Sequence, residues 1–146
     1  MANTDDNFED LKNCALTPDR EQELLDAQRE CVFSWTNKKG EAVGVIVSYF
    51  NHGGKIWMTC AEGRARVSAI RRFPRASVCI TSSGTRLGTG KTITYKGDCI
   101  VHKDRETLDW FYPAFATDRR ATAEGVEAYI EHLNSPDRVV IEFIPD

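Results

Sequence analysis

The sequence predicts a mainly β protein: a six-stranded antiparallel barrel, Greek-key-like or a split β-barrel, with helices at its periphery. Three observations support this prediction. Runs of β-branched and aromatic residues recur at short intervals, glycine-bearing turns separate several of them, and helical patterns are inserted between the later runs. At 146 residues the chain has the usual size of one domain. We expect a flexible N-terminal tail over residues 1–16 and a single barrel domain over residues 17–146.

The first half of the chain predicts one helix followed by three strands. Thr17 suits the N-cap of the helix and Pro18 suits its first position. The pattern then becomes extended, and the turn sequences Asn37–Gly40 and Asn51–Gly54 separate successive runs. Turns this short predict an antiparallel meander. The three predicted strands cover residues 31–36, 42–50 and 55–59.

The second half alternates helices and strands. A short basic helix follows Gly63, and Pro74 ends it. Within the strand that follows the glycine-rich loop, Gly97 suggests a bulge or a close contact with a neighbouring backbone. The remaining elements are predicted strands over residues 76–81, 92–101 and 139–144 and predicted helices over residues 105–115 and 123–133.

Charge is distributed unevenly along the chain. The segment from Arg64 to Lys96 holds eight arginine and lysine residues and no acidic residue, whereas the rest holds eleven basic and 22 acidic residues. Such asymmetry favours a specific anionic ligand over a diffuse polyanion such as nucleic acid. Arginines at the start of a helix suit a phosphate, because the helix N-terminus adds unpaired N–H donors. The alternative is a solvated helix face with incidental ion pairs.

Other sequence features argue against several kinds of site. The segment Gly84–Thr92 resembles a P-loop, but Thr85 stands where the first glycine belongs and a strand follows, so we expect a mobile strand connection. The three histidines have no metal-ligand spacing, and we assign no metal site and no catalytic side chain. The five cysteines are odd in number and form no CxxC pair, which favours structural thiols over a disulfide framework.

The string Arg64–Val78 (RARVSAIRRFPRASV) resembles the pyridoxamine 5′-phosphate oxidase-like superfamily, nearest to its flavin- and deazaflavin-dependent oxidoreductases. Two further strings resemble strands of that family, Tyr95–Ile100 and Asp137–Ile141. The resemblance spans about residues 17 to 145 and implies the FMN-binding split-barrel fold. It also implies a homodimer with two cofactor sites, each built from both chains at the subunit interface.

The resemblance also implies which residues hold the cofactor. Thr59, Arg64, Ala65 and Arg66 would contact its phosphate, and Val43 to Ile46 would offer backbone to its ring or tail. Residues Lys91 to Thr94 would border the substrate pocket. The full set of implied cofactor-binding residues is Val43, Val45, Thr59, Cys60, Arg64, Ala65, Arg66, Lys91 and Thr92.

We therefore expect an oxidoreductase that uses FMN or the deazaflavin coenzyme F420 and transfers hydride to or from a small organic substrate. The alternative is a non-catalytic split barrel that carries a cofactor, senses redox state or binds haem. The sequence does not distinguish FMN from the deazaflavin. No apolar run is long enough to span a membrane and no signal peptide is evident, so we expect a cytoplasmic protein that binds neither nucleic acid nor membrane.

Overall fold

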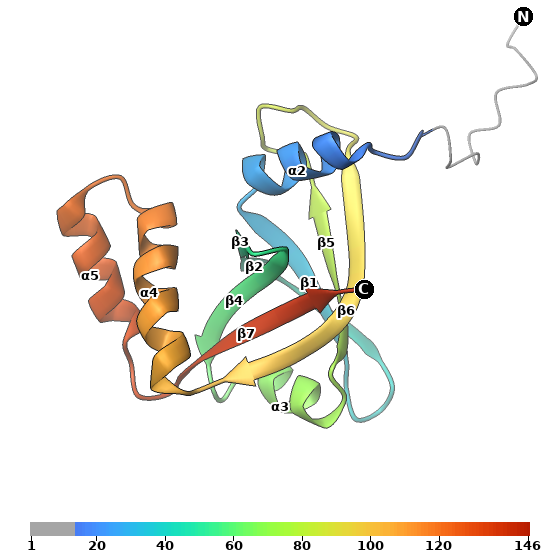
Figure 1. Cartoon of the computed structure of the whole chain (residues 1–146). Helices are drawn as coiled ribbons and strands as arrows, with labels where there is room; N and C mark the ends of the chain where they lie inside the picture. The colour runs from blue at the N-terminus through green and yellow to red at the C-terminus, as the bar shows by residue number, and fades with distance from the viewer. Residues whose placement is uncertain (1–13) are drawn as a thin grey trace, which may run out of the picture.

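The computed structural model describes residues 14–146, so most of the predicted tail, residues 1–13, lies outside the described residues. One antiparallel sheet curls into a half-barrel with helices around it (Figure 1). Its strand order is β2-β1-β5-β6-β7-β4-β3, so the described chain has seven strands where six are predicted. The strands are β1 Glu30–Thr36, β2 Ala42–Ser48, β3 Phe50–His52, β4 Lys55–Ala61, β5 Arg75–Thr81, β6 Thr92–His102 and β7 Arg138–Pro145.

The additional strand arises because the run predicted over residues 42–50 breaks at Tyr49. The Tyr49 ring is buried, its hydroxyl donates to Leu25 O at 2.6 Å, and its backbone N–H donates to Arg29 O at 3.1 Å. These contacts turn the chain through a corner. Strand β2 then pairs with β1, and β3 pairs with β4 at the other end of the sheet. The predicted three-strand meander is therefore wrong, because β2 and β4 belong to opposite ends of the sheet order.

The link through Tyr49 explains why the sheet curls. Strands β2 and β3 are the two edge strands, yet a single residue connects them. A flat sheet would hold its edges six strand spacings apart, roughly 29 Å. The sheet must bend until its two ends meet at Tyr49, and this closes one corner of the barrel.

Two helices lie at opposite ends of the barrel (Figure 1). Helix α2, Pro18–Ala27, begins at the predicted residue and buries Leu24 in the barrel core. Helix α3, Ala65–Arg72, inserts Val67, Ala69 and Ile70 into the same core from the other end. Residue Phe73 caps α3, so the helix ends before Pro74, as predicted.

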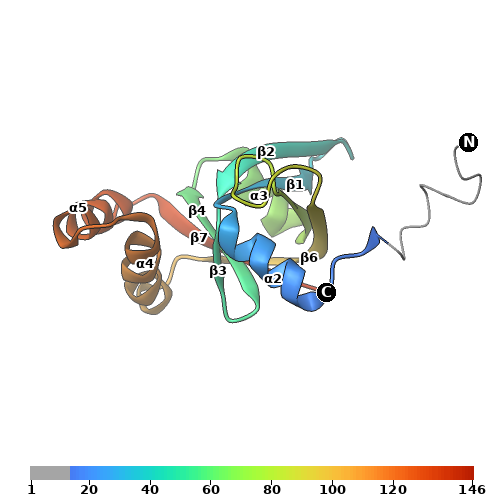
Figure 2. The same ribbon diagram turned by 90° about the horizontal axis from the view of Figure 1, so that it is seen from above.

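Two further helices, α4 Arg105–Arg119 and α5 Ala123–Leu133, lie together at one side of the barrel (Figure 2). Side chains alternate between the faces of a strand, so Val139 and Ile141 of β7 enter the barrel while Val140 faces outward. The outward-facing Val140 belongs to a second apolar cluster, which the helices cover. The remaining buried members of that cluster are Trp57, Leu108, Phe111, Tyr112, Phe115 and Leu133.

Gly97 confirms the close backbone contact predicted at this position. It lies in β6 opposite Ala76 of β5 and Pro145 of β7. A Cβ atom at residue 97 would lie 2.2 Å from the carbonyl oxygen of Ile144. Only glycine allows β7 to approach at this point. Among the described residues, no helix is long and apolar enough to cross a membrane.

Candidate functional site

The split of the barrel lies between two free strand edges. Strand β2 pairs with β1 alone, and β3 covers only the first three residues of β4. Residues Met58–Ala61 therefore pair with β7 on one side and with no described strand on the other. Both free edges run from the Tyr49 corner toward the α3 end of the barrel. Unpaired backbone N–H and C=O groups at such edges are available to a ligand or to another chain.

The predicted residues of β2 and β4 lie on these two edges. Val43 and Val45 turn their side chains toward the barrel core and are half-buried. Hydrogen bonds from Asn37 N–H to Glu41 O and from Tyr49 N–H to Arg29 O fix the alternation of the β1–β2 pairing. The backbone groups of Val43 and Val45 therefore face β1, and those of Gly44 and Ile46 face the split. On the opposite edge, Cys60 turns inward and Thr59 outward.

Two predicted arginines sit where β4 leads into α3. Arg64 is the N-cap residue of the helix, and Arg66 lies in its first turn. Arg64 and Ala65 are exposed and Arg66 is half-buried. Within residues 14–146 no carboxylate lies in ion-pair distance of Arg64 or Arg66. Helix α3 therefore begins with two uncompensated cations beside its own free N–H groups, which suits an anion.

Arg71 and Arg75 are paired with carboxylates, whereas Arg72, at the end of α3, is exposed and has no carboxylate in ion-pair distance within residues 14–146. Arg71 forms an ion pair with Glu62, which also holds Lys103 at 2.9 Å. Arg75 makes two hydrogen bonds of 2.7 Å to Asp146 and one of 3.2 Å to Asp98. Of the two interpretations of the arginine helix, ion pairing accounts for Arg71 and Arg75 and solvation for the exposed Arg72 at the far end. Arg64 and Arg66, at the helix start, remain without a carboxylate partner among the described residues.

Cys60 shows how the positive charges converge at this point. Burial raises the pKa of its thiol, while the nearby charge and hydrogen bond of Arg66 lower it, as do the charges of Arg138 and Arg64. The net shift is upward, so the thiol stays protonated at neutral pH. Three arginines therefore lie close enough to one atom to act on it electrostatically.

Arg138 is the member of this group that the sequence did not assign to the site. It is the first residue of β7 and pairs with Ala61 of β4. Its Nη1 donates to Thr59 Oγ1 at 3.4 Å, and Thr59 Oγ1 donates to the carbonyl oxygen of Val139 at 2.8 Å. The buried Nε of Arg138 has no hydrogen-bond partner among the described residues. The β4–β7 register brings it to the site, and no local sequence signal could have indicated this.

Comparisons with known proteins fit this geometry. No family model and no curated protein sequence matches the chain. Several solved structures match it over most of their length. A Listeria innocua protein named after pyridoxamine 5′-phosphate oxidase has a TM-score of 0.65 at 15% identity, covering 88% of this chain and 92% of that one. The haem storage protein HutZ of Vibrio cholerae has a TM-score of 0.68 at 8% identity, covering 88% and 89%. An F420 reductase has a TM-score of 0.61 at 13% identity, covering 86% and 92%.

The fold is that of the pyridoxamine 5′-phosphate oxidase-like split barrels. At such low identity the likeness establishes the fold and leaves the ligand open. The neighbours themselves bear names that refer to different cofactors and activities. The site residues of this split barrel must therefore be judged on their own chemistry.

Within one chain, Lys91 and Thr92 lie far from Arg64 and Arg66. Thr92 pairs with Thr81 at the end of β5, whereas α3 leads into the start of β5 near Arg75. The length of β5, about 20 Å at the usual rise of a strand, therefore separates Thr92 from α3. Lys91 Nζ donates to Leu87 O at 3.1 Å, within its own loop. In this split barrel, Lys91 and Thr92 could join the site only from a second subunit.

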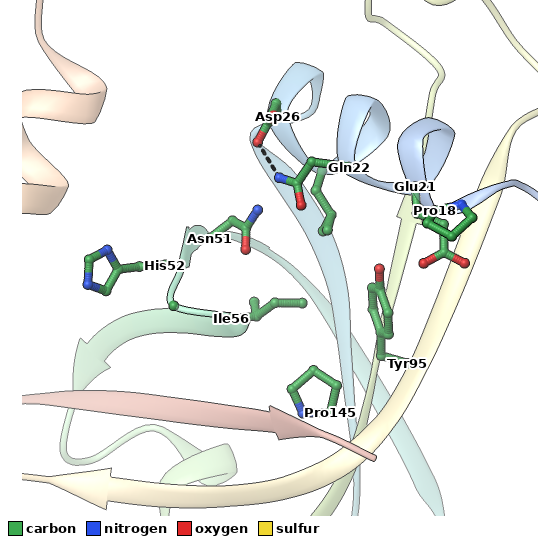
Figure 3. A pocket seen from close by; sticks show the side chains of 12 residues that line it. Pro18, Glu21, Gln22, Asp26, Asn51, His52, Ile56, Tyr95 and Pro145 are labelled. Atoms are coloured by element: carbon green, nitrogen blue, oxygen red, sulfur yellow. Dashed lines mark hydrogen bonds between the residues drawn. The ribbon is translucent and has the colours of Figure 1, made fainter.

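A cavity of about 530 Å³ lies at the α2 end of the split barrel (Figure 3). Glu21 and Tyr95 point toward each other across it, and Asp26 lies on its rim beside Gln22. It is lined by Pro18, Glu21, Gln22, Leu25, Asp26, Asn51, His52, Gly53, Gly54, Ile56, Tyr95 and Pro145. Two carboxylates and no lysine or arginine face this space, so it repels a phosphate. The α3 end of the split, with Arg64 and Arg66, has the charge that suits an anion.

Proposed function

We propose that this split barrel binds FMN or the deazaflavin F420, with the cofactor phosphate at Arg64 and Arg66. The single observation behind the proposal is the pair of arginines without carboxylate partners at the N-terminus of α3. Arginine binds phosphate through parallel N–H donors, and the free N–H groups of the first helical turn add to them. The Ala65 amide belongs to this turn.

The remaining predicted residues fit a cofactor that extends from this point into the split. The free edge of β2, at Gly44 and Ile46 beside Val43 and Val45, offers backbone donors and acceptors to a polar ring or tail. Thr59 and Cys60 lie on the opposite edge. The bound flavin or deazaflavin would supply hydride transfer, while the chain binds the phosphate and orients the ring. We assign no side chain of the chain as an acid or base.

We further propose that the functional unit is a homodimer and that it acts on a small organic substrate. Two solved neighbours are named for redox enzymes, a pyridoxamine 5′-phosphate oxidase and an F420 reductase. A second copy of the chain would also provide the route by which Lys91 and Thr92 reach the site.

A second candidate is a non-catalytic split barrel that binds haem. The observation in its favour is the fold likeness to the haem storage protein HutZ. Against it, the described site residues offer cations and a protonated thiol, whereas haem iron needs an axial ligand such as histidine or thiolate.

An absorption spectrum of the purified protein, with mass spectrometry of the released ligand, tests the proposal. Bound flavin gives two visible bands, the deazaflavin gives one, and haem gives a Soret peak. If the protein is purified empty, FMN, F420 and haemin are each titrated into it. Tight binding of FMN or F420 supports the proposal, and reduction of a substrate by the loaded protein supports the enzyme. Binding of haemin alone, or of none of the three, would overturn it.

A further inference from the structure

We propose that Arg138 is a third phosphate-binding arginine of this site, and that Thr59 serves to position Arg138 and does not itself bind the phosphate. This inference rests on the proposed function and extends it. It assigns a direct contact to a residue of β7, and it changes the role that the family resemblance implies for Thr59.

The hydrogen bonding of Thr59 leaves it no proton for a phosphate. A threonine hydroxyl has one proton, and that of Thr59 goes to the carbonyl oxygen of Val139 at 2.8 Å. A phosphate dianion accepts hydrogen bonds and donates none. Thr59 can therefore reach a phosphate oxygen only by leaving Val139. Its oxygen already accepts the hydrogen bond from Arg138 Nη1, so the hydroxyl holds the guanidinium in place.

Arg138 has the donors that Thr59 lacks. A guanidinium carries five N–H donors, and among the described residues only Nη1 of Arg138 has an acceptor, at the long distance of 3.4 Å. No carboxylate of residues 14–146 lies in ion-pair distance of it. The Nε atom is buried with no partner at all. A buried unpaired donor is unfavourable, so an acceptor is expected here.

Other arginines of the chain show what a structural role requires. Arg75 is held by two carboxylates. Arg119, whose buried Nε also lacks a hydrogen-bond partner, donates from Nη2 to two main-chain carbonyls. Arg138 has only the hydroxyl of Thr59. Nearby, the hydroxyl of Tyr112 is also buried without a partner, in a side chain 2% exposed. The charge of Arg138 acts on Tyr112, so the two unpaired groups are neighbours, and an acceptor bound between them would satisfy both.

The test compares FMN with riboflavin, which lacks the phosphate. Dissociation constants are measured by fluorescence for the wild type and for Arg138→Ala, Arg138→Lys, Thr59→Val and Thr59→Ser. Loss of a charge-assisted hydrogen bond predicts that Arg138→Ala weakens FMN binding by about 10- to 100-fold. Riboflavin binding should stay within about threefold, and Arg138→Lys should lie between Arg138→Ala and the wild type because lysine retains the charge but not the planar donors. Thr59→Val should weaken FMN less than Arg138→Ala, and Thr59→Ser should restore it.

The matched control is Arg71→Ala, which removes a nearby positive charge that Glu62 already neutralises. Equal losses of FMN affinity in Arg71→Ala and Arg138→Ala would overturn the inference, because a general electrostatic effect would then explain both. A second measurement follows the Nε–Hε NMR signals of the wild type during titration with inorganic phosphate. The Arg138 signal should shift with the Arg66 signal.

These measurements separate the two proposals. If Arg66→Ala weakens FMN binding and Arg138→Ala does not, the proposed function stands and the role of Arg138 is wrong. If the wild type binds FMN no better than riboflavin and neither arginine signal responds to phosphate, both proposals fail. If Arg138 responds to phosphate and Arg66 does not, the phosphate site lies at β7 and the assignment to α3 must be abandoned.

Discussion

The guanidinium of Arg119, in the last turn of α4, donates a hydrogen bond to the main-chain carbonyl of Tyr49, the residue that joins β2 to β3. The same Nη2 atom donates to Arg29 O at 3.0 Å, and Arg29 Nη1 donates to Asp118 O at 2.9 Å. The Arg119 side chain is only 9% exposed and its guanidinium lies over the Phe115 ring. Helix α4 is thereby tied to the corner where the two ends of the sheet meet.

Replacing Arg119 with methionine should therefore destabilise the barrel. The apolar stem is retained, while two carbonyls lose a charged donor, so we expect a loss of about 2–4 kcal/mol in the free energy of unfolding. Chemical denaturation measures it. The control is Arg120→Met, whose exposed guanidinium lies over Tyr129 and whose loss should stay under about 1 kcal/mol. Equal losses would show that the Tyr49 corner does not depend on Arg119.

Gly97→Ala should be among the most damaging single-atom changes in the sheet. The added Cβ would lie 2.2 Å from Ile144 O and 3.0 Å from the Phe143 ring, so β6 and β7 must separate. We expect a loss of about 3 kcal/mol, the upper part of the range for overpacking. At Gly63 no described atom lies within 4 Å of an added Cβ, and Gly63→Ala should change stability by under about 0.5 kcal/mol. Thermal unfolding of the two variants should differ accordingly.

Local patterns were sufficient to predict most elements of this fold. The start of α2 at Pro18, the bounds of α5 at Ala123–Leu133 and the close approach at Gly97 all follow from neighbouring residues. The break at Tyr49 does not, because tyrosine and phenylalanine favour strands and the run shows no glycine or proline there. Contacts with Leu25, Arg29 and Arg119, distant in sequence, make the corner.

The candidate site, like the fold, could be predicted from the sequence only in part. Arg64 and Arg66 were predictable because they share one helix start with the free amides that attract an anion. Arg138 stands 79 residues from Thr59, and only the pairing register of β4 and β7 makes them neighbours. Sequence spacing also could not show that the length of β5 separates Lys91 and Thr92 from α3.

Arg66→Ala should weaken FMN binding by about 10- to 100-fold, because a charged donor to the phosphate is lost. Arg72→Ala is the matched control: it removes the same charge from the exposed far end of α3 and should cost less than about threefold, since bulk solvent screens it. Fluorescence titration with FMN at constant ionic strength measures both. FMN affinity that is unchanged in Arg66→Ala would refute the phosphate role of this residue.

The buried carboxylate of Glu142 should make stability depend on pH. Burial raises its pKa, but hydrogen bonds from Lys55 and His102 outweigh burial and hold the pKa below its ordinary value. The Glu142 side chain is 8% exposed, and His102 Nε2 lies 2.6 Å from Oε2. Because the folded-state pKa is the lower one, this stabilisation is present above the unfolded pKa and is lost as pH falls through the folded pKa.

Glu142→Gln should therefore destabilise the protein by about 2 kcal/mol at pH 7, and the difference from the wild type should shrink below about pH 4. Urea unfolding at pH 7 and pH 3.5 measures it. Glu131→Gln, on the exposed face of α5, should match the wild type at both pH values. A difference for Glu142→Gln that is as large at pH 3.5 as at pH 7 would contradict the ionic role.

Replacing Tyr112 or Tyr49 with phenylalanine should change the free energy of unfolding in opposite directions. Both rings are buried, at 2% and 3% exposure, but Tyr49 donates its hydroxyl to Leu25 O at 2.6 Å while the Tyr112 hydroxyl has no partner among the described residues. Removing a satisfied hydroxyl loses a hydrogen bond, and removing a buried unsatisfied one relieves a desolvation penalty. Tyr49→Phe should therefore lower the free energy of unfolding by about 1 kcal/mol, and Tyr112→Phe should raise it by about 1 kcal/mol.

Chemical denaturation of the ligand-free protein measures both changes. If Tyr112→Phe is destabilised as much as Tyr49→Phe, the Tyr112 hydroxyl has a hydrogen-bond partner in solution, such as an ordered water between it and Arg138. Such a water would also satisfy the Arg138 Nε, and a phosphate would then have to displace it. The stability of Tyr112→Phe thus indicates whether the donors beside Thr59 are free before a cofactor binds.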